Sequence, residues 1–161
     1  MALRNIVEKG DSVLAKHCRP VTDFNEKLHI LLDDMAETLM QANGVGLAEP
    51  QVGLLRRAVL VLETNHAEDE DDYIIELINP EIVAKSGAQE GPEGCLSIPG
   101  RRCTVERPTK VVVHALNRRG REIEVTGTSL LARCLCHEID HLDGILYVDK
   151  MIEDVTDKEG N

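Results

Sequence analysis

The sequence predicts an α+β protein in which a mostly antiparallel sheet lies between an N-terminal helix and a C-terminal helix. Three observations support this class: an amphipathic segment near the start, several short β-branched stretches in the middle, and a second largely apolar helical segment near the end. A helix, then several strands, then a helix is the order typical of an α+β domain.

The first helix is expected over residues 22–42. Thr22 or Asp23 would cap its start, and Glu26 stands where a capping box places an acidic residue. The helix should end before Gly44. Its apolar residues recur at steps of three and four and would form one buried face: Leu28, Leu31, Leu32, Met35 and Leu39.

Four stretches between the helices are rich in β-branched residues and are predicted to be strands. They are Arg57–Leu62, Ile74–Ile78, Lys110–Leu116 and Glu122–Val125. The acidic run at 66–72 is expected to be a solvated loop. The last helix is predicted from Ser129 to Leu142, where Asp143-Gly144 offers an end because glycine readily adopts the left-handed conformation.

Length and composition are those of one globular domain with a short tail. The chain has 161 residues, of which 42% are hydrophobic and 29% are charged. These values are ordinary for a folded domain, so disorder is not expected. We assign residues 1–150 to a single domain and residues 151–161 to a polar, frayed C-terminal tail.

The charge balance excludes two classes of partner. Lys and Arg number 18 and Asp and Glu number 29, which gives a formal net charge of −11. Such a chain has no electrostatic footprint for direct binding of nucleic acid or of an anionic membrane. No apolar run approaches the roughly 20 residues that span a bilayer, and no secretory signal is visible. The five cysteines are an odd number, so we expect reduced thiols in a cytoplasmic protein.

A candidate metal site lies in the C-terminal helix, where residues 137–141 read His-Glu-Ile-Asp-His. The four-residue spacing places both imidazoles on one helix face, about 6 Å apart along the axis, so both can reach one ion. Glu138 can act as a general base toward a water molecule beside the metal. The apolar stretch before His137 predicts a buried histidine pair, and a metal would explain why that pair is buried.

A catalytic metal site needs a third protein ligand and one open position. The position at which metzincins carry a third histidine is Tyr147, and Glu153 and Glu159 lie in a tail with little room to fold back. Cys134 lies on the same helix stripe, but about 10 Å of rise separates it from His141, so these ligands do not easily converge. The third ligand is therefore expected elsewhere in the chain.

Cys95 is the candidate for this third ligand. It stands within Glu93-Gly94-Cys95-Leu96-Ser97, and a neighbouring glycine lets the backbone approach an ion closely. Gly91-Pro92 and Gly94 permit tight backbone turns, and residues 97–100 are expected to follow as an extended or turning segment. The remaining cysteines are expected to be small buried hydrophobic residues: Cys18, Cys103, Cys134 and Cys136.

Three separated motifs resemble those of bacterial peptide deformylases. Residues 44–51, GVGLAEPQ, resemble G-x-G-L-A-A-x-Q; residues 93–97 match E-G-C-L-S; and residues 137–141 match H-E-x-D-H. Their order and spacing fit the family over residues 10–150. Two positions depart from the usual family residues: Glu49 stands in place of alanine and Cys136 in place of glutamine. Neither departure removes a metal ligand, the base or an oxyanion donor.

The resemblance implies a metal-dependent hydrolase that removes the N-formyl group from the N-terminal formyl-methionine of newly synthesised polypeptides and releases formate. It implies one divalent metal ion, natively Fe²⁺, with Zn²⁺, Ni²⁺ or Co²⁺ as substitutes. The ligands in this chain would be Cys95, His137 and His141. Glu138 would be the catalytic base, while the Gln51 side-chain amide and the Leu96 backbone N–H would stabilise negative charge on the formyl oxygen.

The implied partners are formyl-methionyl nascent peptides, with the ribosome as a further candidate and no direct contact with nucleic acid or membrane. The residues that would contact the peptide are Val45, Gly46, Gly94, Leu130, Cys134 and Arg102. Backbone groups of the first three would pair with the peptide as an added strand. Leu130 and Cys134 share the helix stripe of the histidines and would wall an apolar methionine pocket, while Arg102 would meet the distal end of the peptide.

Two other functions fit parts of the pattern. A zinc peptidase that cuts internal amide bonds predicts a third ligand other than Cys95. A degenerate relative that keeps the metal only for structure predicts a closed fourth position, with Cys134 or Cys136 as an additional ligand. The presence of Glu138 and Gln51 disfavours the structural site, because it needs neither residue.

Overall fold

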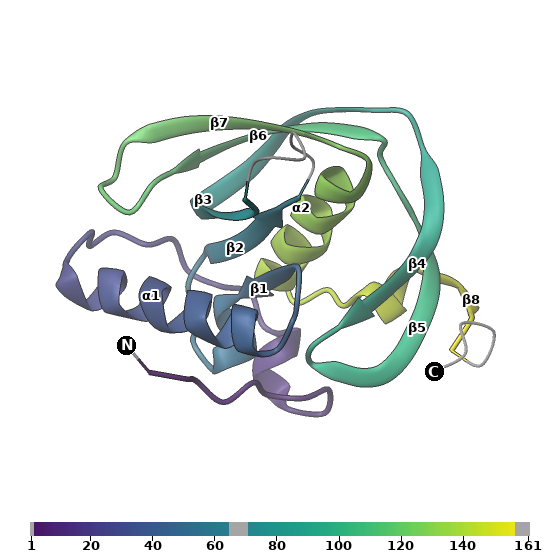
Figure 1. Cartoon of the computed structure of the whole chain (residues 1–161), viewed down its shortest axis with the longest axis horizontal. Helices are drawn as coiled ribbons and strands as arrows, with labels where there is room; N and C mark the ends of the chain where they lie inside the picture. Colours follow the sequence, from purple (N-terminus) through teal and green to yellow (C-terminus); the bar gives the residue numbers. More distant parts are fainter. Residues whose placement is uncertain (1, 65–70, 157–161) are drawn as a thin grey trace.

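The computed structural model describes residues 2–64 and 71–156 (Figure 1). The helices in this part of the chain are η1 (Ser12–Ala15), α1 (Glu26–Gln41), η2 (Glu49–Val52), α2 (Ser129–Leu142) and η3 (Tyr147–Lys150), where η marks a 3-10 helix. The strands are β1 (Gly46–Ala48), β2 (Ala58–Glu63), β3 (Tyr73–Ser86), β4 (Gln89–Cys95), β5 (Ile98–Arg107), β6 (Lys110–Leu116), β7 (Glu122–Thr128) and β8 (Met151–Asp154).

The strands form two sheets, and every pairing between named strands is antiparallel. One sheet has the order β1-β2-β3-β6-β7 and the other has the order β4-β5-β8. Figure 1 shows α2 in the middle of the molecule, with the five-stranded sheet curling over it and the β4–β5 hairpin on another side. The predicted α+β class, with antiparallel sheets packed around the C-terminal helix, is confirmed.

The five-stranded sheet is buried on both faces at β2, because the side chains of this strand alternate between two helices. On β2, Val59 and Val61 pack in the core cluster that contains α2, while Ala58 and Leu60 pack in the cluster that contains α1. All four are fully buried. Enclosed in this way, α2 buries almost every residue from Leu131 to Leu142, including both histidines of the motif.

The bounds of the two predicted helices agree with the expectation to within one residue, except at the start of the first helix. The last helix begins and ends where predicted, and Gly144 after it has a φ of 76°. The first helix begins at Glu26, not near residue 22, because Asn25 is the actual cap: its side-chain oxygen accepts a hydrogen bond of 3.1 Å from the Leu28 N–H. The predicted apolar face of this helix is buried.

The predicted strands are confirmed, but strand structure extends further than the sequence indicated. The strand predicted at Ile74–Ile78 continues to Ser86 as β3, and β7 continues to Thr128. The glycines and proline at 91–94 could permit tight turns, but these residues lie in β4, and the chain turns at Leu96 and Ser97. Pro92 fits in β4 because this strand lies at the edge of its sheet, where a missing N–H costs little.

The polar tail is also more ordered than expected. Residues Met151–Asp154 form β8, which pairs with β5 of the small sheet, and Val155 is buried. Residues 157–161 lie outside the described part of the chain, as does most of the acidic run, residues 66–70. The division into a domain over 1–150 and a tail over 151–161 stays a prediction.

Two findings bear on the expected environment of the protein. No helix in the described residues is long and apolar enough to cross a membrane. All five cysteines are free thiols, and four of them are buried as expected: Cys18, Cys103, Cys134 and Cys136.

Candidate metal centre

The three predicted metal ligands meet between α2 and the end of β4. His137 and His141 lie one turn apart on the buried face of α2, with ring centroids 5.1 Å apart. Cys95 is the last residue of β4, and its sulfur lies 3.4 Å from Nε2 of His141. One ligand atom from each of the three residues lies within 4.8 Å of the others. This convergence brings Cys95 to two histidines that lie more than 40 positions further along the chain.

The chemistry of these donors fits a divalent transition metal. One thiolate and two imidazoles form a mixed sulfur and nitrogen set that suits iron, zinc, nickel and cobalt. Burial lowers the pKa of His141 well below its ordinary value, so the ring is neutral and keeps a lone pair for an ion. Among the described residues, neither Cys134 nor Cys136 belongs to the ligand cluster, which leaves three protein ligands, as a catalytic site requires.

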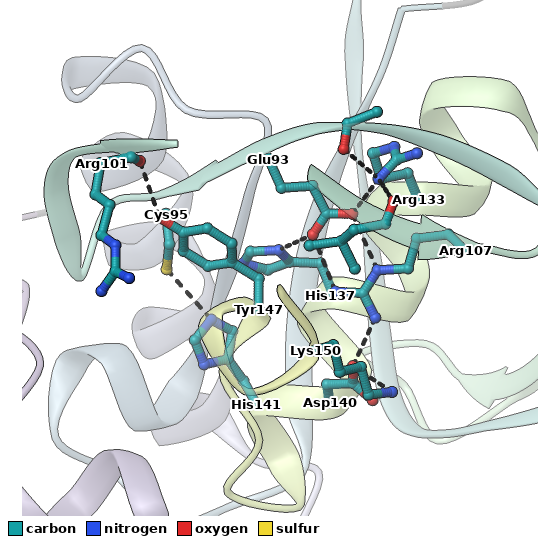
Figure 2. A network of polar contacts seen from close by, with 12 residues as sticks. Glu93, Cys95, Arg101, Arg107, Arg133, His137, Asp140, His141, Tyr147 and Lys150 are labelled. Atoms are coloured by element: carbon teal, nitrogen blue, oxygen red, sulfur yellow. Dashed lines mark hydrogen bonds and ion pairs between the residues drawn. The ribbon is translucent and has the colours of Figure 1, made fainter. Parts of the chain in front are cut away.

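His137 is held in one orientation by two neighbours. Its Nδ1 atom lies 2.9 Å from the Glu93 carboxylate, so the opposite ring nitrogen is left for the metal. The ring of Tyr147 stacks on it, with centroids 5.7 Å apart and an interplanar angle of 23°. Figure 2 shows Glu93 and Tyr147 converging on this imidazole.

Glu93 is the centre of a buried ion network. Arg107 donates two hydrogen bonds of 2.9 Å to its carboxylate, and Arg133 donates another of 2.6 Å (Figure 2). Burial raises the pKa of Glu93, but the hydrogen bonds from His137 and Arg107 outweigh it and bring that pKa to about 2. The carboxylate is therefore ionised throughout the neutral range and fixes the ring of His137.

Asp140 extends this network on the other side of Arg107. Its carboxylate accepts a hydrogen bond of 2.7 Å from Arg107 and lies 3.1 Å from the ammonium group of Lys150. Arg133, seven residues before Asp140 on the same helix, is instead turned to Glu93 and to the carbonyl groups of Gly91 and Val105.

Glu138 lies beside the ligands in a very different setting. Its side chain is buried, and its Oε1 atom has no hydrogen-bond partner within the described residues. The carboxylate packs against Gly46 so closely that a Cβ atom at position 46 would collide with it. Burial raises the pKa of Glu138 to about 7. A carboxyl group with this pKa can take up and release a proton near neutral pH.

Two of the three ligands, Cys95 and His137, line a cleft with a volume of about 570 Å³. Cys95, His137 and Glu138 contribute to its floor, and Leu130 and Val45 are half exposed at its rim. The six residues predicted to contact a substrate all line it: Val45, Gly46, Gly94, Leu130, Cys134 and Arg102. The cleft therefore gives an extended chain access to the metal ligands and to Glu138.

Comparison with known proteins identifies the family to which this chain belongs. The family model described as polypeptide deformylase matches residues 3–157. The chain belongs to the polypeptide deformylase family. It is 54% identical over 159 residues to the peptide deformylase of Acetivibrio thermocellus, covering 99% of this chain and 89% of that protein.

Solved deformylase structures share the fold. The crystal structure of a peptide deformylase from Legionella pneumophila superposes with a TM-score of 0.85 at 45% identity, covering 92% of this chain and 86% of that one. A class I type b peptide deformylase from Acinetobacter baumannii, bound to Met-Ala-Ser, gives a TM-score of 0.85 at 33% identity and covers 92% and 98%. Peptide deformylases are metal-dependent hydrolases that remove the formyl group from the N-terminal formyl-methionine of nascent polypeptides, and this chain is such an enzyme.

The two residues expected to stabilise an oxyanion in this deformylase lie next to Cys95. Gln51 is buried behind the cleft; its Oε1 accepts a hydrogen bond from the Ala48 N–H, and its Nε2 donates to Ser97 and lies 3.5 Å from the Cys95 sulfur. Leu96 follows Cys95 in the turn and lines the cleft. The first two deformylase motifs are thus joined by a direct contact at the metal ligand.

The two departures from the usual deformylase residues lie away from the cleft. Glu49 is fully buried, and its carboxylate accepts a hydrogen bond of 3.3 Å from Arg56. Burial raises its pKa to about 7. Cys136 is a buried thiol on α2, and neither residue is among those that line the cleft.

Sequence reasoning missed the residues that position His137 in this deformylase. In the sequence, Glu93 was noted only as the first residue of a motif, and Tyr147 only because it occupies the position at which metzincins carry a third histidine. No strand pattern marked Glu93, because β4 was not predicted and its pairing with β5 shifts register between Glu93 and Cys95. No pattern marks Arg107 or Arg133 either, because their roles depend on contacts between β4, β5 and α2.

Proposed function

We propose that this deformylase holds one Fe²⁺ ion through Cys95, His137 and His141, and that deformylation takes place beside it. The observation that carries this assignment is the convergence of the three ligand atoms within 4.8 Å of one another, beside a cleft that Cys95 and His137 line. When bound, the ion polarises the formyl group and makes water more acidic. Zn²⁺, Ni²⁺ or Co²⁺ would fit the same donors.

Glu138 acts as the general base and then as the general acid. It accepts a proton from the attacking water and passes it to the nitrogen of the leaving amine, which becomes the new N-terminus. A pKa of about 7 supports both steps, because the carboxyl group is then neither too weak a base nor too weak an acid. Its Oε1 has no partner within the described residues and so remains available for proton transfer.

Gln51 and Leu96 stabilise the negative charge that develops on the formyl oxygen. The Gln51 amide is fixed through the hydrogen bond that its oxygen accepts from Ala48, so its amide nitrogen is held beside Cys95 and Ser97. Leu96 contributes its backbone N–H from the adjacent turn. Removal of one such donor typically reduces the rate on the order of 10²–10³-fold.

The substrate lies in the cleft as an added strand. Backbone groups of Val45, Gly46 and Gly94 pair with the peptide, and the methionine side chain enters the apolar pocket between Leu130 and Cys134. Support comes from the position of these residues along the cleft and from the related Acinetobacter baumannii enzyme, whose structure contains Met-Ala-Ser. Arg102 lies further out and meets the distal part of the peptide.

The cellular setting follows from the substrate. Nascent formylated peptides are made in the cytoplasm, so we place the enzyme there, with the ribosome as a candidate partner. The net charge of −11 does not favour direct contact with ribosomal RNA. Residues 1–150 would form the catalytic domain, with 151–161 as its C-terminal extension.

Formate release tests the assignment. The protein is purified anaerobically, loaded with Fe²⁺ or Ni²⁺, and incubated with a formyl-methionyl peptide or with its acetyl analogue. We expect formate from the formyl peptide and no turnover of the acetyl analogue. Removal of the metal by a chelator should abolish activity, and its return should restore it. Equal turnover of both peptides, or of neither, would reject the proposal.

A further inference from the structure

Glu49 is a buried acidic residue that the metal centre and the cleft leave without a task. Its side chain is fully buried, and its Oε1 atom lies 3.3 Å from Nε and 3.2 Å from Nη2 of Arg56. Its Oε2 atom has no hydrogen-bond partner among the described residues. A carboxylate held in this way depends on that arginine, because an unpaired charge in the interior of a protein is costly.

Glu49 begins the 3-10 helix that carries Gln51. η2 has only four residues and is weak on its own, as short 3-10 helices are, so it needs contacts from outside. The Gln51 carbonyl accepts a hydrogen bond of 2.8 Å from the Val7 N–H, and the Glu49 carbonyl accepts one of 3.2 Å from the Leu54 N–H. Because Glu49 and Gln51 lie two positions apart in one turn, displacement of the Glu49 side chain from the core would move the Gln51 amide as well.

The backbone of Arg56 is fixed by a second segment of the chain. Arg19 and Arg56 form a parallel bridge, in which the Arg57 N–H donates a hydrogen bond of 2.9 Å to the Arg19 carbonyl. The Arg19 N–H in turn donates one of 2.9 Å to the Leu55 carbonyl. The Arg56 side chain is 36% exposed, whereas that of Glu49 is 0% exposed. Arg56 is therefore anchored at the surface, directly over a carboxylate that lies in the core.

The other ionisable groups on the segments around Glu49 are neutral or already paired. Burial, with a smaller contribution from the charge of Glu49, raises the pKa of the Cys18 thiol to about 11, so this neighbour is uncharged. Three further ionisable groups form a cluster of their own: Arg57, His17 and Asp143. Burial raises the pKa of Glu49 itself to about 7 although Arg56 opposes the shift, so removal of Arg56 would raise it further.

We propose that Arg56 is a positioning residue for the oxyanion donor: by neutralising the buried carboxylate of Glu49, it keeps η2 in the core and holds the Gln51 amide beside Cys95. The inference rests on the proposed function and adds a residue on which Gln51 depends. With alanine at position 49, the usual residue of the family, no buried charge would need a partner and Arg56 would be dispensable. The need for Arg56 is therefore one that Glu49 creates.

The test is a cycle of single and double substitutions in the metal-loaded enzyme, with a formyl-methionyl peptide as substrate. Arg56→Met removes the charge and keeps the aliphatic chain, and kcat should fall about tenfold with little change in KM, because an oxyanion donor acts mainly in the transition state. Glu49→Ala should keep kcat within about twofold, and so should Glu49→Ala combined with Arg56→Met, because neither leaves a buried charge unpaired.

The pH dependence gives a readout that a general loss of stability would not change. In Arg56→Met, the Glu49 side chain can stay in the core only when it is protonated. The ratio of kcat in the unsubstituted enzyme to kcat in this variant should therefore be close to one at about pH 6 and should increase to about tenfold at about pH 9. For the double variant, the ratio should not change with pH.

Amide hydrogen exchange reports on the position of Gln51 without any turnover. The Ala48 N–H donates a hydrogen bond of 2.9 Å to the Gln51 side-chain oxygen, so its exchange rate measures how well that side chain is held. In the Zn²⁺-loaded protein at about pH 8, this rate should increase about tenfold in Arg56→Met and return to its original value in the double variant.

Arg4→Met is the matched control. The Arg4 side chain is 38% exposed and lies 2.8 Å from the buried carboxylate of Asp34 on α1, and neither residue lines the cleft. This variant should lose stability as Arg56→Met does, but kcat and the exchange of the Ala48 N–H should not change. If Arg56→Met does not fold, Arg56→Gln takes its place, and the same rescue by Glu49→Ala is expected.

Each other outcome has a definite meaning. Unchanged kcat and unchanged Ala48 exchange in Arg56→Met would overturn the inference while leaving the deformylase activity established. A loss that Glu49→Ala does not rescue would show that Arg56 acts independently of Glu49, which also overturns it. An equal loss of kcat in Arg4→Met would reduce the effect to general stability and overturn it as well. If the unsubstituted enzyme released no formate, the proposed function would fail and the inference would fail with it.

Discussion

Glu93 and Glu138 are two buried carboxylates in one site, and they differ in the number of hydrogen-bond donors that contact them. Glu93 is 5% exposed and Glu138 is 4% exposed, so burial alone does not distinguish them. Glu93 accepts hydrogen bonds from Arg107, Arg133 and His137, whereas Glu138 has an oxygen without a partner in the described residues. The number of cationic partners therefore decides which carboxylate stays charged and which can change its charge.

This difference assigns the two residues to different tasks. With a pKa of about 2, Glu93 keeps a constant charge and fixes the ring of His137. With a pKa of about 7, Glu138 can exchange a proton under physiological conditions. The same amino acid is thus a positioning residue in one place and a candidate base in the other.

The strongest test of this contrast replaces the candidate base, Glu138, by the isosteric residue glutamine. Glu138→Gln should reduce kcat by about 10²–10⁴-fold, because the amide cannot accept and return a proton. The metal content should stay unchanged, since no ligand is altered. Formate release and elemental analysis of the purified variant measure the two quantities, and near-normal turnover would remove Glu138 from the mechanism.

A second test displaces Glu138 without changing it. In Gly46→Ala, the added Cβ would collide with the carboxylate and push it away from the ligands. A shift of about 1 Å in a catalytic group can cost about 10²-fold, so we expect a loss of that order in kcat. Gly94→Ala is the matched control, because a Cβ there meets its nearest atom at 3.5 Å, an ordinary contact. Its effect should fall mainly on KM, and equal losses of kcat in both variants would contradict this explanation.

Neutralising the other carboxylate should weaken metal binding. Glu93→Gln removes the charge that orients His137, and loss of such a partner typically reduces metal affinity about 10–100-fold. It also leaves Arg107 and Arg133 without their shared carboxylate, so the free energy of unfolding should fall by about 3–5 kcal/mol. Competition with a metal chelator and urea denaturation measure the two effects. Unchanged metal affinity would show that Tyr147 alone holds the ring.

The pH dependence of stability should have opposite signs at the two positions in the metal-free protein. The pKa of Glu93 falls from an ordinary 4.5 to about 2, so its stabilisation is present above pH 4.5 and is lost as pH falls toward 2. The pKa of Glu138 rises from 4.5 to about 7, so its ionisation destabilises the fold as pH rises through that window. Each effect is about 3 kcal/mol in size.

Unfolding free energies between pH 3 and 8 check these signs. Relative to the unsubstituted protein, Glu138→Gln should gain stability as pH rises through the window from about 4.5 to 7. For Glu93→Gln, the loss of unfolding free energy relative to the unsubstituted protein should become smaller as pH falls toward 3. Parallel curves for the two variants would mean that their surroundings do not differ as described.

The parts of the fold that sequence predicted are those coded by one stretch of residues. The apolar stripe of Ser129–Leu142 defines α2 correctly, and β-branched runs mark β2 and β6. β4 was missed because Gln-Glu-Gly-Pro-Glu-Gly-Cys has little intrinsic strand preference and pairs only because β5 lies beside it. β8 was missed for the same reason, since its charged residues pair with β5.

The site divides in the same way. The resemblance predicts that Cys95, His137 and His141 lie together, and in the structure their ligand atoms are within reach of one another. The partners of Glu93 could not be predicted, because the hydrogen bonds that join it to Arg107 and Arg133 connect three separate elements. Arg102 was expected at the cleft, but only the structure shows that its charge lacks a partner in the described residues.

The pairing of β8 with β5 has a consequence for the synthesis of the enzyme itself. β8 completes the small sheet, whose strand β4 ends at Cys95. Tyr147, which stacks on His137, lies just before β8 in the chain. During synthesis, the three ligand residues therefore precede the segment that braces them. The ligand cluster can reach its final form only after β8 has left the ribosome and paired with β5.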